Sequence, residues 1–178
     1  MAVKKKYHDI TLEVLDSIIP ILAFNPETLC GKVIKFDLTK ILKGKNAEAK
    51  FLVKKKGEVL VGEIFSFALY PSFIRKMIGR NISIVEDSFS VKCKDVTLRF
   101  KPFFITRKKV HRNVRKALRE SAKYFILKTA QEKERKNIFQ AVIAGTLQRV
   151  LSKRLKKIYP LAVCEIRVLK VEKPKEQF

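Results

Sequence analysis

Residue types that commonly build catalytic and metal sites are scarce in this chain. Its 178 residues include no tryptophan, two histidines, three cysteines and six glycines. One histidine lies near the N-terminus and the other within a basic run, so there is no histidine cluster for acid–base or metal chemistry. The glycines form no GxGxxG, GxxxxGK or GxSxG pattern. We therefore expect neither an enzyme nor a bound metal, organic cofactor or small-molecule substrate.

The cysteines lie more than sixty residues apart, at Cys30, Cys93 and Cys164. They form no CxxC pair, so neither a zinc ribbon nor a redox motif is indicated. Because disulfide scaffolds pair their cysteines, the odd number favours buried or inert thiols in a reducing, cytoplasmic compartment.

Long hydrophobic runs are also missing. Three lysines precede "IIPILAF" within residues 1–24, which gives this region some likeness to a targeting segment. Acidic residues interrupt it before the apolar run begins: Asp9, Glu13 and Asp16. No window reaches the about 18 uninterrupted apolar residues that a membrane helix needs. We expect a soluble or peripheral chain that does not span a membrane.

Acidic residues are few, with 17 Asp and Glu against 40 Lys and Arg, which gives a net charge of +23. The excess is +7 in residues 1–100 and +16 in residues 101–178. A compact chain with this charge repels itself, and a polyanionic partner would supply the missing negative charge. Nucleic acid is the first candidate, contacted mainly by the C-terminal part.

Length and apolar content predict one domain over residues 1–178, because 47% of the residues are hydrophobic and a chain this long buries most of its apolar surface. Residues 1–24 are an N-terminal extension that fits either a strand pair broken near Pro20 or a short helix. Residues 172–178 are expected to be a frayed tail. No internal repeat or linker divides the chain.

Alternation of apolar and polar residues predicts strands over 33–39, 81–93 and 95–107. Within the last of these, Pro102 should lie at an edge or bulge, because it cannot donate to a ladder. A hairpin is expected around "KKKG", and a final strand over 161–171. "NPETLCG" predicts a single turn and "YPSFIRKMIGR" a short helix.

Helical spacing begins after Arg107, where an apolar stripe from Val110 to Phe125 is flanked by cations. "QEKERKN" is a polar connection, with Asn137 as the cap of a second helix that continues to Ile158. Five or six mainly antiparallel strands followed by two long helices give an α+β fold. We expect a curled antiparallel sheet or β-barrel-like core with long C-terminal helices.

The stretch "TRKKVHRNVRKALR" carries seven cations and no carboxylate. A solvated helix normally interleaves acidic residues at four-residue spacing, and like charges one turn apart repel unless anions lie between them. Phosphates would do this, and the planar guanidinium binds them bidentately. The RNA-binding residues predicted here are Arg107, Lys108, Lys109, Arg112, Arg115, Lys116, Arg119 and, on the same helix, Lys123.

Other candidate cations belong to the second helix: Lys153, Arg154, Lys156 and Lys157. At the hairpin tip, Lys54, Lys55 and Lys56 fit a solvated turn as well as a phosphate contact. The sequence has no zinc finger and no aromatic pattern of an RNA-recognition sheet, so we expect shape and backbone reading of a folded RNA. Four aromatic residues near the basic stretch are interpreted as core rather than as base-stacking residues: Phe103, Phe104, Tyr124 and Phe125.

Three segments carry a resemblance: "GKVIKFDL", "RFKPFFITRKK" with the following "RKALR", and "IYPLAVCEIRVLKVEKPK". In the last segment the matching positions are Ile158–Leu161, Glu165–Arg167 and Lys173–Pro174. On these segments the chain resembles the small-subunit ribosomal protein family of archaea and eukaryotes called S-three-A-e or e-S-one, over roughly residues 25–175.

The resemblance implies a structural rRNA-binding protein on the platform of the small ribosomal subunit, near the mRNA exit. Its partners would be rRNA, neighbouring platform proteins and passing mRNA, and its location the cytoplasmic ribosome. The chain departs from the family pattern in three places. "KKKYHD" stands where the family has a Lys-Lys-Trp-Tyr-like motif, "ALYPSF" replaces a "DLTRD"-like element, and "CKDV" shortens a turn.

Two alternatives remain open. The first is a free basic RNA- or DNA-binding adaptor that is not built into the ribosome. The second is binding to an anionic membrane, which would need a helix with a bulky apolar face free to insert. The apolar stripes of both predicted helices are expected to pack against the sheet instead, so we expect no membrane partner.

Overall fold

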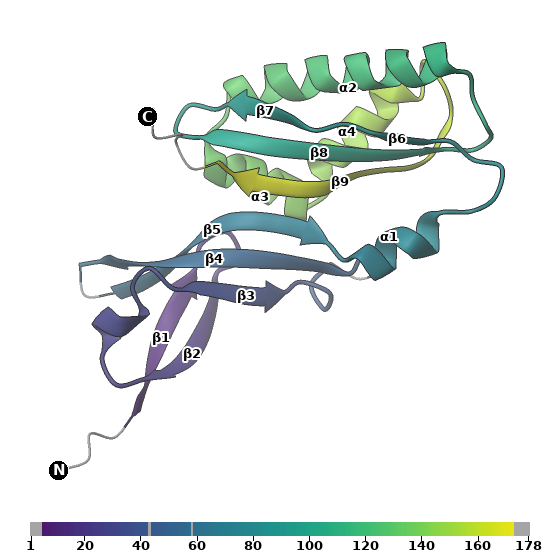
Figure 1. Ribbon diagram of the computed structural model, residues 1–178. Helices are drawn as coiled ribbons and strands as arrows, with labels where there is room; N and C mark the ends of the chain where they lie inside the picture. The colour runs from purple at the N-terminus through teal and green to yellow at the C-terminus, as the bar shows by residue number, and fades with distance from the viewer. Residues whose placement is uncertain (1–4, 43, 58, 173–178) are drawn as a thin grey trace, which may run out of the picture.

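A computed structural model describes residues 5–42, 44–57 and 59–172, which form nine β-strands and four α-helices (Figure 1). The strands are β1 Lys6–Leu12, β2 Ser17–Ala23, β3 Val33–Asp37, β4 Ala47–Lys56, β5 Val59–Leu69, β6 Ile84–Glu86, β7 Phe89–Lys92, β8 Thr97–Thr106 and β9 Leu161–Val171. The helices are α1 Pro71–Met77, α2 Arg112–Gln131, α3 Arg135–Ile143 and α4 Thr146–Leu155. Of the predicted tail, the structure describes Glu172 alone. The rest of the tail lies outside the described residues, including Lys173 and Pro174 of the family resemblance.

All nine strands belong to one open, mixed sheet, in agreement with the predicted α+β class. Its path is β2-β1-β5-β9-β8-β6, with β4 and β3 continuing from β5, and β7 pairing with β8. β1 and β5 are parallel, and the other pairs are antiparallel. One expectation needs correction: the strands number nine rather than five or six, because residues 6–23 contribute two strands and the predicted strand 81–93 is divided into β6 and β7. The sheet is open, which favours the predicted curled sheet over the barrel-like alternative.

Residues 6–23 form a β-hairpin, which decides between the strand pair and the short helix. The pairing runs from Lys6 opposite Ala23 to Leu12 opposite Ser17. β2 is an edge strand and continues through Pro20 without the expected break. An edge strand accommodates proline because only one of its sides needs backbone donors.

Several further strand predictions are confirmed, and one is wrong. The hairpin around "KKKG" forms β4 and β5, and the final predicted strand is β9. Pro102 lies at a register shift between β8 and β9, as expected for a residue without an N–H. The stretch 81–93 is not one strand, since β6 and β7 are separated at Asp87 and Ser88. There the Asp87 carboxylate accepts a hydrogen bond from the Ser88 N–H (2.8 Å), which favours a turn.

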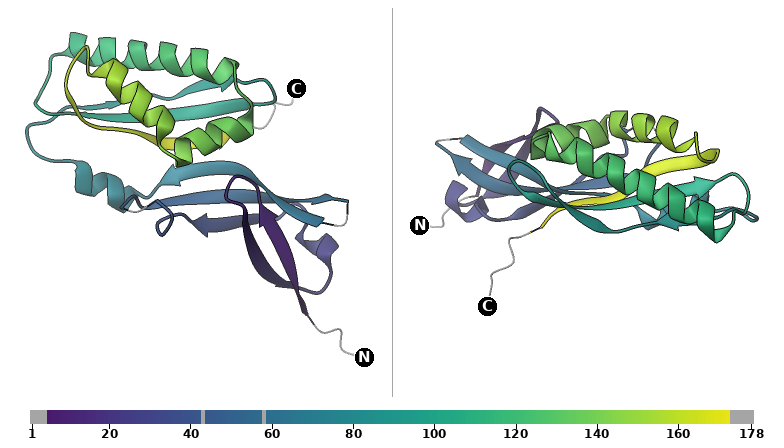
Figure 2. Two further views of the ribbon diagram at one scale, coloured as in Figure 1. Left: turned by 180° about the vertical axis from the view of Figure 1, so that it is seen from behind. Right: turned by 90° about the horizontal axis from the view of Figure 1, so that it is seen from above.

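The second C-terminal helix is two helices, α3 and α4, rather than the single helix predicted to reach Ile158. Gly145 adopts φ 73°, a left-handed conformation that separates them. α3 also begins earlier than predicted, with Glu134 rather than Asn137 at its N-cap. The break lets α4 contact β9 while α3 contacts β5 (Figure 2).

Helices α2, α3 and α4 cover one side of the sheet, and the left view of Figure 2 looks onto this helical layer. α2 buries a stripe at four-residue spacing, Leu118, Ala122, Ile126 and Ala130. The C-terminal half of the buried stripe lies one residue later than predicted, with Ile126 buried where Phe125 was expected. The reason is that the i,i+4 row that starts at Leu118 faces the sheet. The other side of β7, β8 and β9 is not covered by any described helix (Figure 1).

Candidate nucleic-acid interface

The first three predicted cations, Arg107–Lys109, lie on the segment that joins β8 to α2, and all three are exposed. The segment is anchored by Thr106, which is fully buried. Its hydroxyl donates to the Lys108 carbonyl (2.7 Å) and accepts from the Ser83 N–H (3.0 Å). The Ser83 hydroxyl accepts from the Val110 N–H (3.1 Å). The three cations therefore project from a backbone that is fixed by hydrogen bonds.

His111 caps the N-terminus of α2, where its Nδ1 accepts a hydrogen bond from the Asn113 N–H (3.4 Å). First-turn N–H groups lack partners within the helix, so an acceptor at this position stabilises the helix. Sequence reasoning missed this role, because histidine is not among the common N-cap residues. The cap fixes where the basic helix begins.

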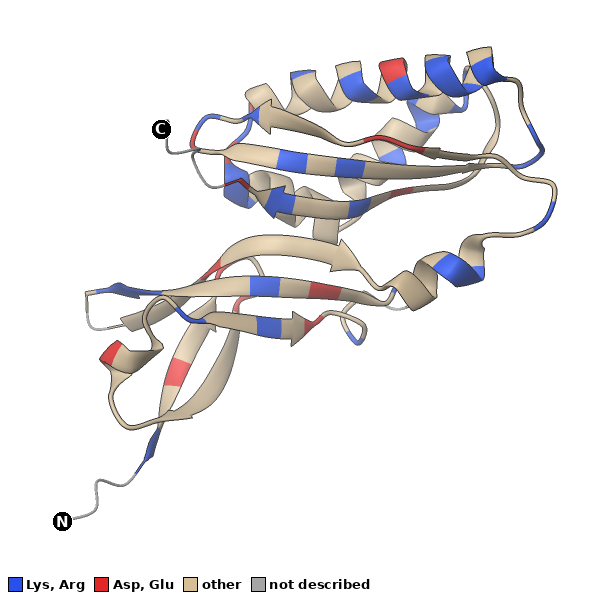
Figure 3. Ribbon diagram, in the orientation of Figure 1, with Lys and Arg blue, Asp and Glu red and all other residues tan. Residues whose placement is uncertain are grey.

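Five cations of α2 form one exposed surface, which we call the helix face: Arg112, Arg115, Lys116, Arg119 and Lys123. They occupy two i,i+4 rows, and side chains four residues apart on a helix lie one above the other. The buried stripe of α2 points toward the sheet, so the helix face points toward solvent. Figure 3 shows basic segments repeated along the outer side of α2.

One acidic residue lies beside the helix face. Glu120 pairs with Lys116 (3.8 Å), and both side chains are mostly exposed, so the pair contributes little and is screened by salt. Within the part of the chain that the structure describes, no carboxylate forms an ion pair with the other four cations. Their mutual repulsion is therefore largely uncompensated.

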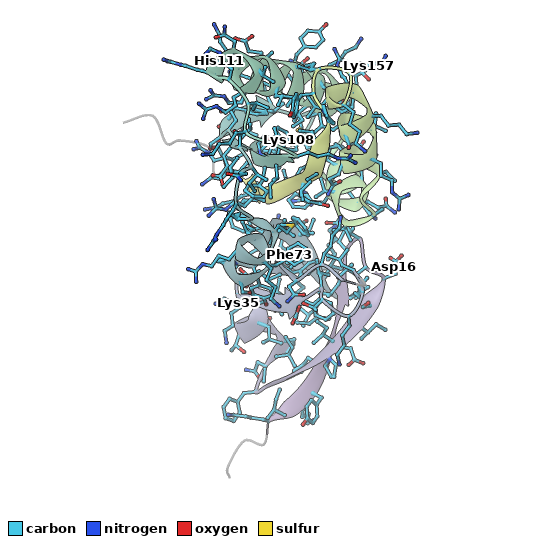
Figure 4. All side chains as sticks on the ribbon, turned by 90° about the vertical axis from the view of Figure 1, so that its right-hand side faces the viewer. Asp16, Lys35, Phe73, Lys108, His111 and Lys157 are labelled. Carbon is cyan, nitrogen blue, oxygen red and sulfur yellow. The ribbon has the colours of Figure 1, made fainter. Side chains whose placement is uncertain are left out.

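The residues after α4 lie beside the residues before α2. The Arg107 N–H donates to the Pro160 carbonyl (3.4 Å), and Figure 4 looks onto this end of the molecule, where Lys108 and Lys157 are labelled. Five exposed cations gather here as the end cluster: Arg107, Lys108, Lys109, Lys156 and Lys157. The fold thus brings together two groups of predicted cations that are distant in sequence.

Arg154 differs from the other predicted cations because it lies over two aromatic rings of α2. Its guanidinium carbon is 5.5 Å from the centroid of Tyr124 and 5.8 Å from that of Phe125, a favourable cation–π geometry. Phe103 and Phe104 are fully buried, as predicted, and Phe125 is half-buried. Tyr124 is 60% exposed, so its predicted place in the core is wrong. An aromatic ring therefore lies on the surface beside the helix face.

Lys54–Lys56 are the last residues of β4 and lie in the lower half of Figure 1, away from α2. Lys54 and Lys56 pair with Glu63 (2.8 and 3.9 Å), and Lys55 pairs with Glu27 (3.8 Å). Burial raises the pKa of Glu63, but hydrogen bonds from Lys54 and Arg135 outweigh it and leave the pKa below its ordinary value. Each lysine of the triplet thus has a carboxylate of the chain within ion-pair distance, although Lys54 and Lys56 share Glu63. These pairs favour the solvated turn. A phosphate contact here stays a prediction.

Lys153 and Lys156 line a groove of about 950 Å³ between α4 and the turns that follow β1 and β3. Lys45 and Arg149 add positive charge to it, although Lys45 pairs with Glu165 (2.6 Å). Positive charge on this side of α4 therefore continues from the end cluster toward the N-terminal strands.

The thiols are mostly unreactive. Burial raises the pKa of Cys93 to about 11 and that of Cys164 to about 12, so both are protonated at neutral pH. Cys30 is exposed, so of the predicted buried or inert thiols it is not a buried one. Among the described residues, no three or more His, Cys, Asp or Glu side chains gather as metal ligands would. No described helix combines the length and the apolar character that crossing a membrane requires.

Three archaeal proteins, each named "Small ribosomal subunit protein eS1", are similar to this chain in sequence. The protein from Methanothrix thermoacetophila is 29% identical over 151 residues, which cover 82% of this chain and 72% of that protein. The protein from Saccharolobus islandicus is 32% identical over 126 residues, or 70% of this chain and 61% of that protein. The protein from Nanoarchaeum equitans is 25% identical over 160 residues, or 87% of this chain and 80% of that protein.

The family comparison covers more of the chain than the first two relatives do. The model of the Ribosomal S3Ae family matches residues 5–175, a range that includes every described strand and helix. It also includes the helix face and the end cluster. The chain therefore belongs to the ribosomal S3Ae family.

Proposed function

We propose that this protein is a structural constituent of the small ribosomal subunit that binds folded rRNA through the helix face and the end cluster. The observation that carries the proposal is the helix face, with five exposed cations in two i,i+4 rows and one carboxylate beside them. Phosphates between these rows would remove the repulsion that the chain leaves uncompensated. Family membership and the names of the relatives support a ribosomal setting.

The role is structural rather than catalytic. Phosphate contacts fix register and orientation without reading sequence, and folded RNA is recognised through its shape and backbone. The cations would screen phosphate repulsion where rRNA segments converge. The resemblance of the chain favours the platform near the mRNA exit, with platform proteins as neighbours, mRNA nearby and the cytoplasmic ribosome as the location.

Salt dependence tests the helix face. Replacing Arg112, Arg115 and Lys116 with glutamine should flatten the log–log dependence of binding on salt by about two to three units. Each neutralised phosphate contributes about 0.7 to 0.9 to that slope. The measurement is filter binding of a small-subunit rRNA transcript over a range of NaCl concentrations.

The matched control replaces three exposed cations away from this surface, Lys76, Lys133 and Lys136, with glutamine and so removes the same charge. Its slope should change by less than one unit. An unchanged slope in the helix-face variant, or equal flattening in the control, would contradict the proposal.

Sedimentation separates ribosomal assembly from a free basic adaptor. On a sucrose gradient of cell extract, a ribosomal constituent should migrate with small subunits and stay there in moderate salt. An adaptor should remain in the light fractions at the top of the gradient.

A further inference from the structure

The side of the sheet without helices carries a row of cations that crosses several strands. In register, Ser90 lies opposite Arg99 and Arg99 opposite Lys170. The row continues across the sheet, with Lys170 opposite Ser66, Ser66 opposite Lys50 and Lys50 opposite Lys35. Directly opposed residues of antiparallel strands project from the same side of the sheet. We call the four cations of this line the sheet row: Arg99, Lys170, Lys50 and Lys35.

Burial confirms which side of the sheet the row occupies. The sequence neighbours of the row, such as Phe100, Leu169 and Ala49, are fully buried. Arg99, Lys170 and Lys35 are exposed, and Lys50 is half-exposed. Side chains alternate between the two sides of a strand, so the sheet row points away from the core. Figure 3 shows basic segments on the four strands that carry it, β3, β4, β8 and β9.

The sheet row contains two like-charged pairs, Arg99 opposite Lys170 and Lys50 opposite Lys35. Like charges directly opposite each other destabilise a sheet. Arg99 pairs with Glu172, and Lys50 pairs with Glu48 (3.4 Å), but neither pair is buried. Among the described residues, no carboxylate lies within ion-pair distance of Lys170 or Lys35. The arrangement leaves places for external anions.

An aromatic ring lies beside this row. The register between β4 and β5 shifts at Lys50, so that Phe65 has no partner on β4. Phe65 is half-buried, and the Lys170 ammonium lies 5.9 Å from its ring centroid. Surfaces that bind single-stranded nucleic acid combine cations that follow the backbone with aromatic rings that stack on bases. Both elements occur together here.

We propose that the sheet row and Phe65 bind a single-stranded RNA segment, and that the protein thereby joins this segment to a folded RNA held on the helix face. The second part rests on the proposed function, whereas the first stands on the sheet alone. The buried stripe of α2 packs against β6 and β7, on the side of the sheet where Val91 and Phe100 are buried. The two cationic surfaces therefore point in different directions, and two RNA segments reach them without competing for the same cations.

A two-RNA retention assay tests this. A double-stranded RNA hairpin of about 16 base pairs is immobilised on beads, the protein is added, and retention of a fluorescent oligouridylate of about 12 nucleotides is measured. Fluorescence anisotropy measures binding of the same oligouridylate to free protein. The sheet-row variant replaces Arg99, Lys170, Lys50 and Lys35 with glutamine. The control replaces four other exposed cations, Lys40, Lys76, Lys133 and Lys136, and so has the same net charge.

We expect the wild-type protein and the control to retain the oligouridylate on hairpin beads. The sheet-row variant should bind the hairpin as the control does, while its affinity for the oligouridylate falls about tenfold. Phe65→Leu keeps an apolar side chain but removes the ring, and should weaken oligouridylate binding by about fivefold or more. Circular dichroism and thermal melting confirm that each variant is folded.

Two results would overturn the inference. In the first, the sheet-row variant binds the oligouridylate as well as the wild type does. In the second, the control loses as much affinity as the sheet-row variant, which would show a response to net charge alone. Failure of the proposed function would give a different result, because the wild-type protein would then not bind the hairpin. Fluorescence anisotropy would still measure whether the sheet row binds the oligouridylate.

Discussion

Arg135 shows how single side chains connect distant parts of this chain. It donates to Glu63 (3.2 Å) and to Glu13 (3.1 Å), and the three side chains are 12 to 19% exposed. Arg135 opens α3, Glu63 belongs to β5 and Glu13 follows β1. The contact joins the helical layer to the N-terminal strands. No sequence pattern indicated this contact, because the partners are 72 and 122 residues apart and belong to no motif.

Glu63→Gln tests this network through its pH dependence. Because the folded-state pKa of Glu63 is lowered, the carboxylate stabilises the fold above the ordinary pKa of 4.5, and this contribution is lost as pH falls through the folded value. The variant should be less stable than wild type at neutral pH by about 1–2 kcal/mol. Its free energy of unfolding should fall less between about pH 5 and pH 3. Urea denaturation at a series of pH values measures both effects.

The control is Glu27→Gln, since Glu27 is 81% exposed. It should follow the wild-type pH profile. If Glu63→Gln also follows that profile, the ion-pair network does not stabilise the folded state.

The sequence identified the candidate cations of α2 but not all of the residues that surround them. Helical spacing identified Arg112, Arg115 and Arg119 as exposed neighbours, because one period of 3.6 residues fixes which side chains share a helix side. The cap at His111 and the exposed ring of Tyr124 were not identified. Both depend on how α2 meets the rest of the fold, which local pattern does not report.

The sequence predicted the long strands and helices that have a regular apolar pattern. It did not predict the turns that divide two of the expected segments. The β4–β5 hairpin, β8, β9 and α2 follow from apolar spacing over ten or more residues. The division into α3 and α4 was not predicted, because apolar residues keep their helical spacing on both sides of Gly145. The same limit applies to β6 and β7, where alternation continues across the turn between them.

Gly145→Ala tests the break between α3 and α4. The residue has φ 73°, where an L side chain is strained, and a Cβ there would meet no atom within 4 Å. The substitution should therefore destabilise the protein by about 1 kcal/mol through backbone strain alone. Urea denaturation should show a lower midpoint with an unchanged m value.

Gly79→Ala is the matched comparison, because its Cβ also meets open space and Gly79 has no positive φ. It should be neutral or slightly stabilising. Equal destabilisation by both substitutions would argue against strain at Gly145.

Over the whole molecule, Lys and Arg outnumber Asp and Glu, so the carboxylates of the chain do not neutralise its positive charge. The sequence predicted the excess of +23 and its concentration in residues 101–178. It did not predict that this charge lies on more than one side. Strand register places the sheet row, and register depends on pairing between segments that are distant along the chain.

Added salt should stabilise the free protein. Raising the ionic strength from about 0.01 M to about 0.15 M shortens the Debye length from about 30 Å to about 8 Å and so weakens self-repulsion. We expect the melting temperature measured by circular dichroism to rise by a few degrees. The rise should be smaller in the variant with glutamine at Arg112, Arg115 and Lys116. A fall in melting temperature would mean that the internal ion pairs outweigh the repulsion.

The position of β9 has a consequence for synthesis of the protein. β9 lies between β5 and β8, yet residues 161–171 emerge from a translating ribosome after every other described strand. Until then, β5 and β8 each keep an unpaired edge, and the N-terminal strands have no strand that joins them to β8. Such edges invite aggregation. We therefore expect the nascent chain to be prone to aggregation until β9 has left the ribosome, and a product truncated before Leu161 to remain so.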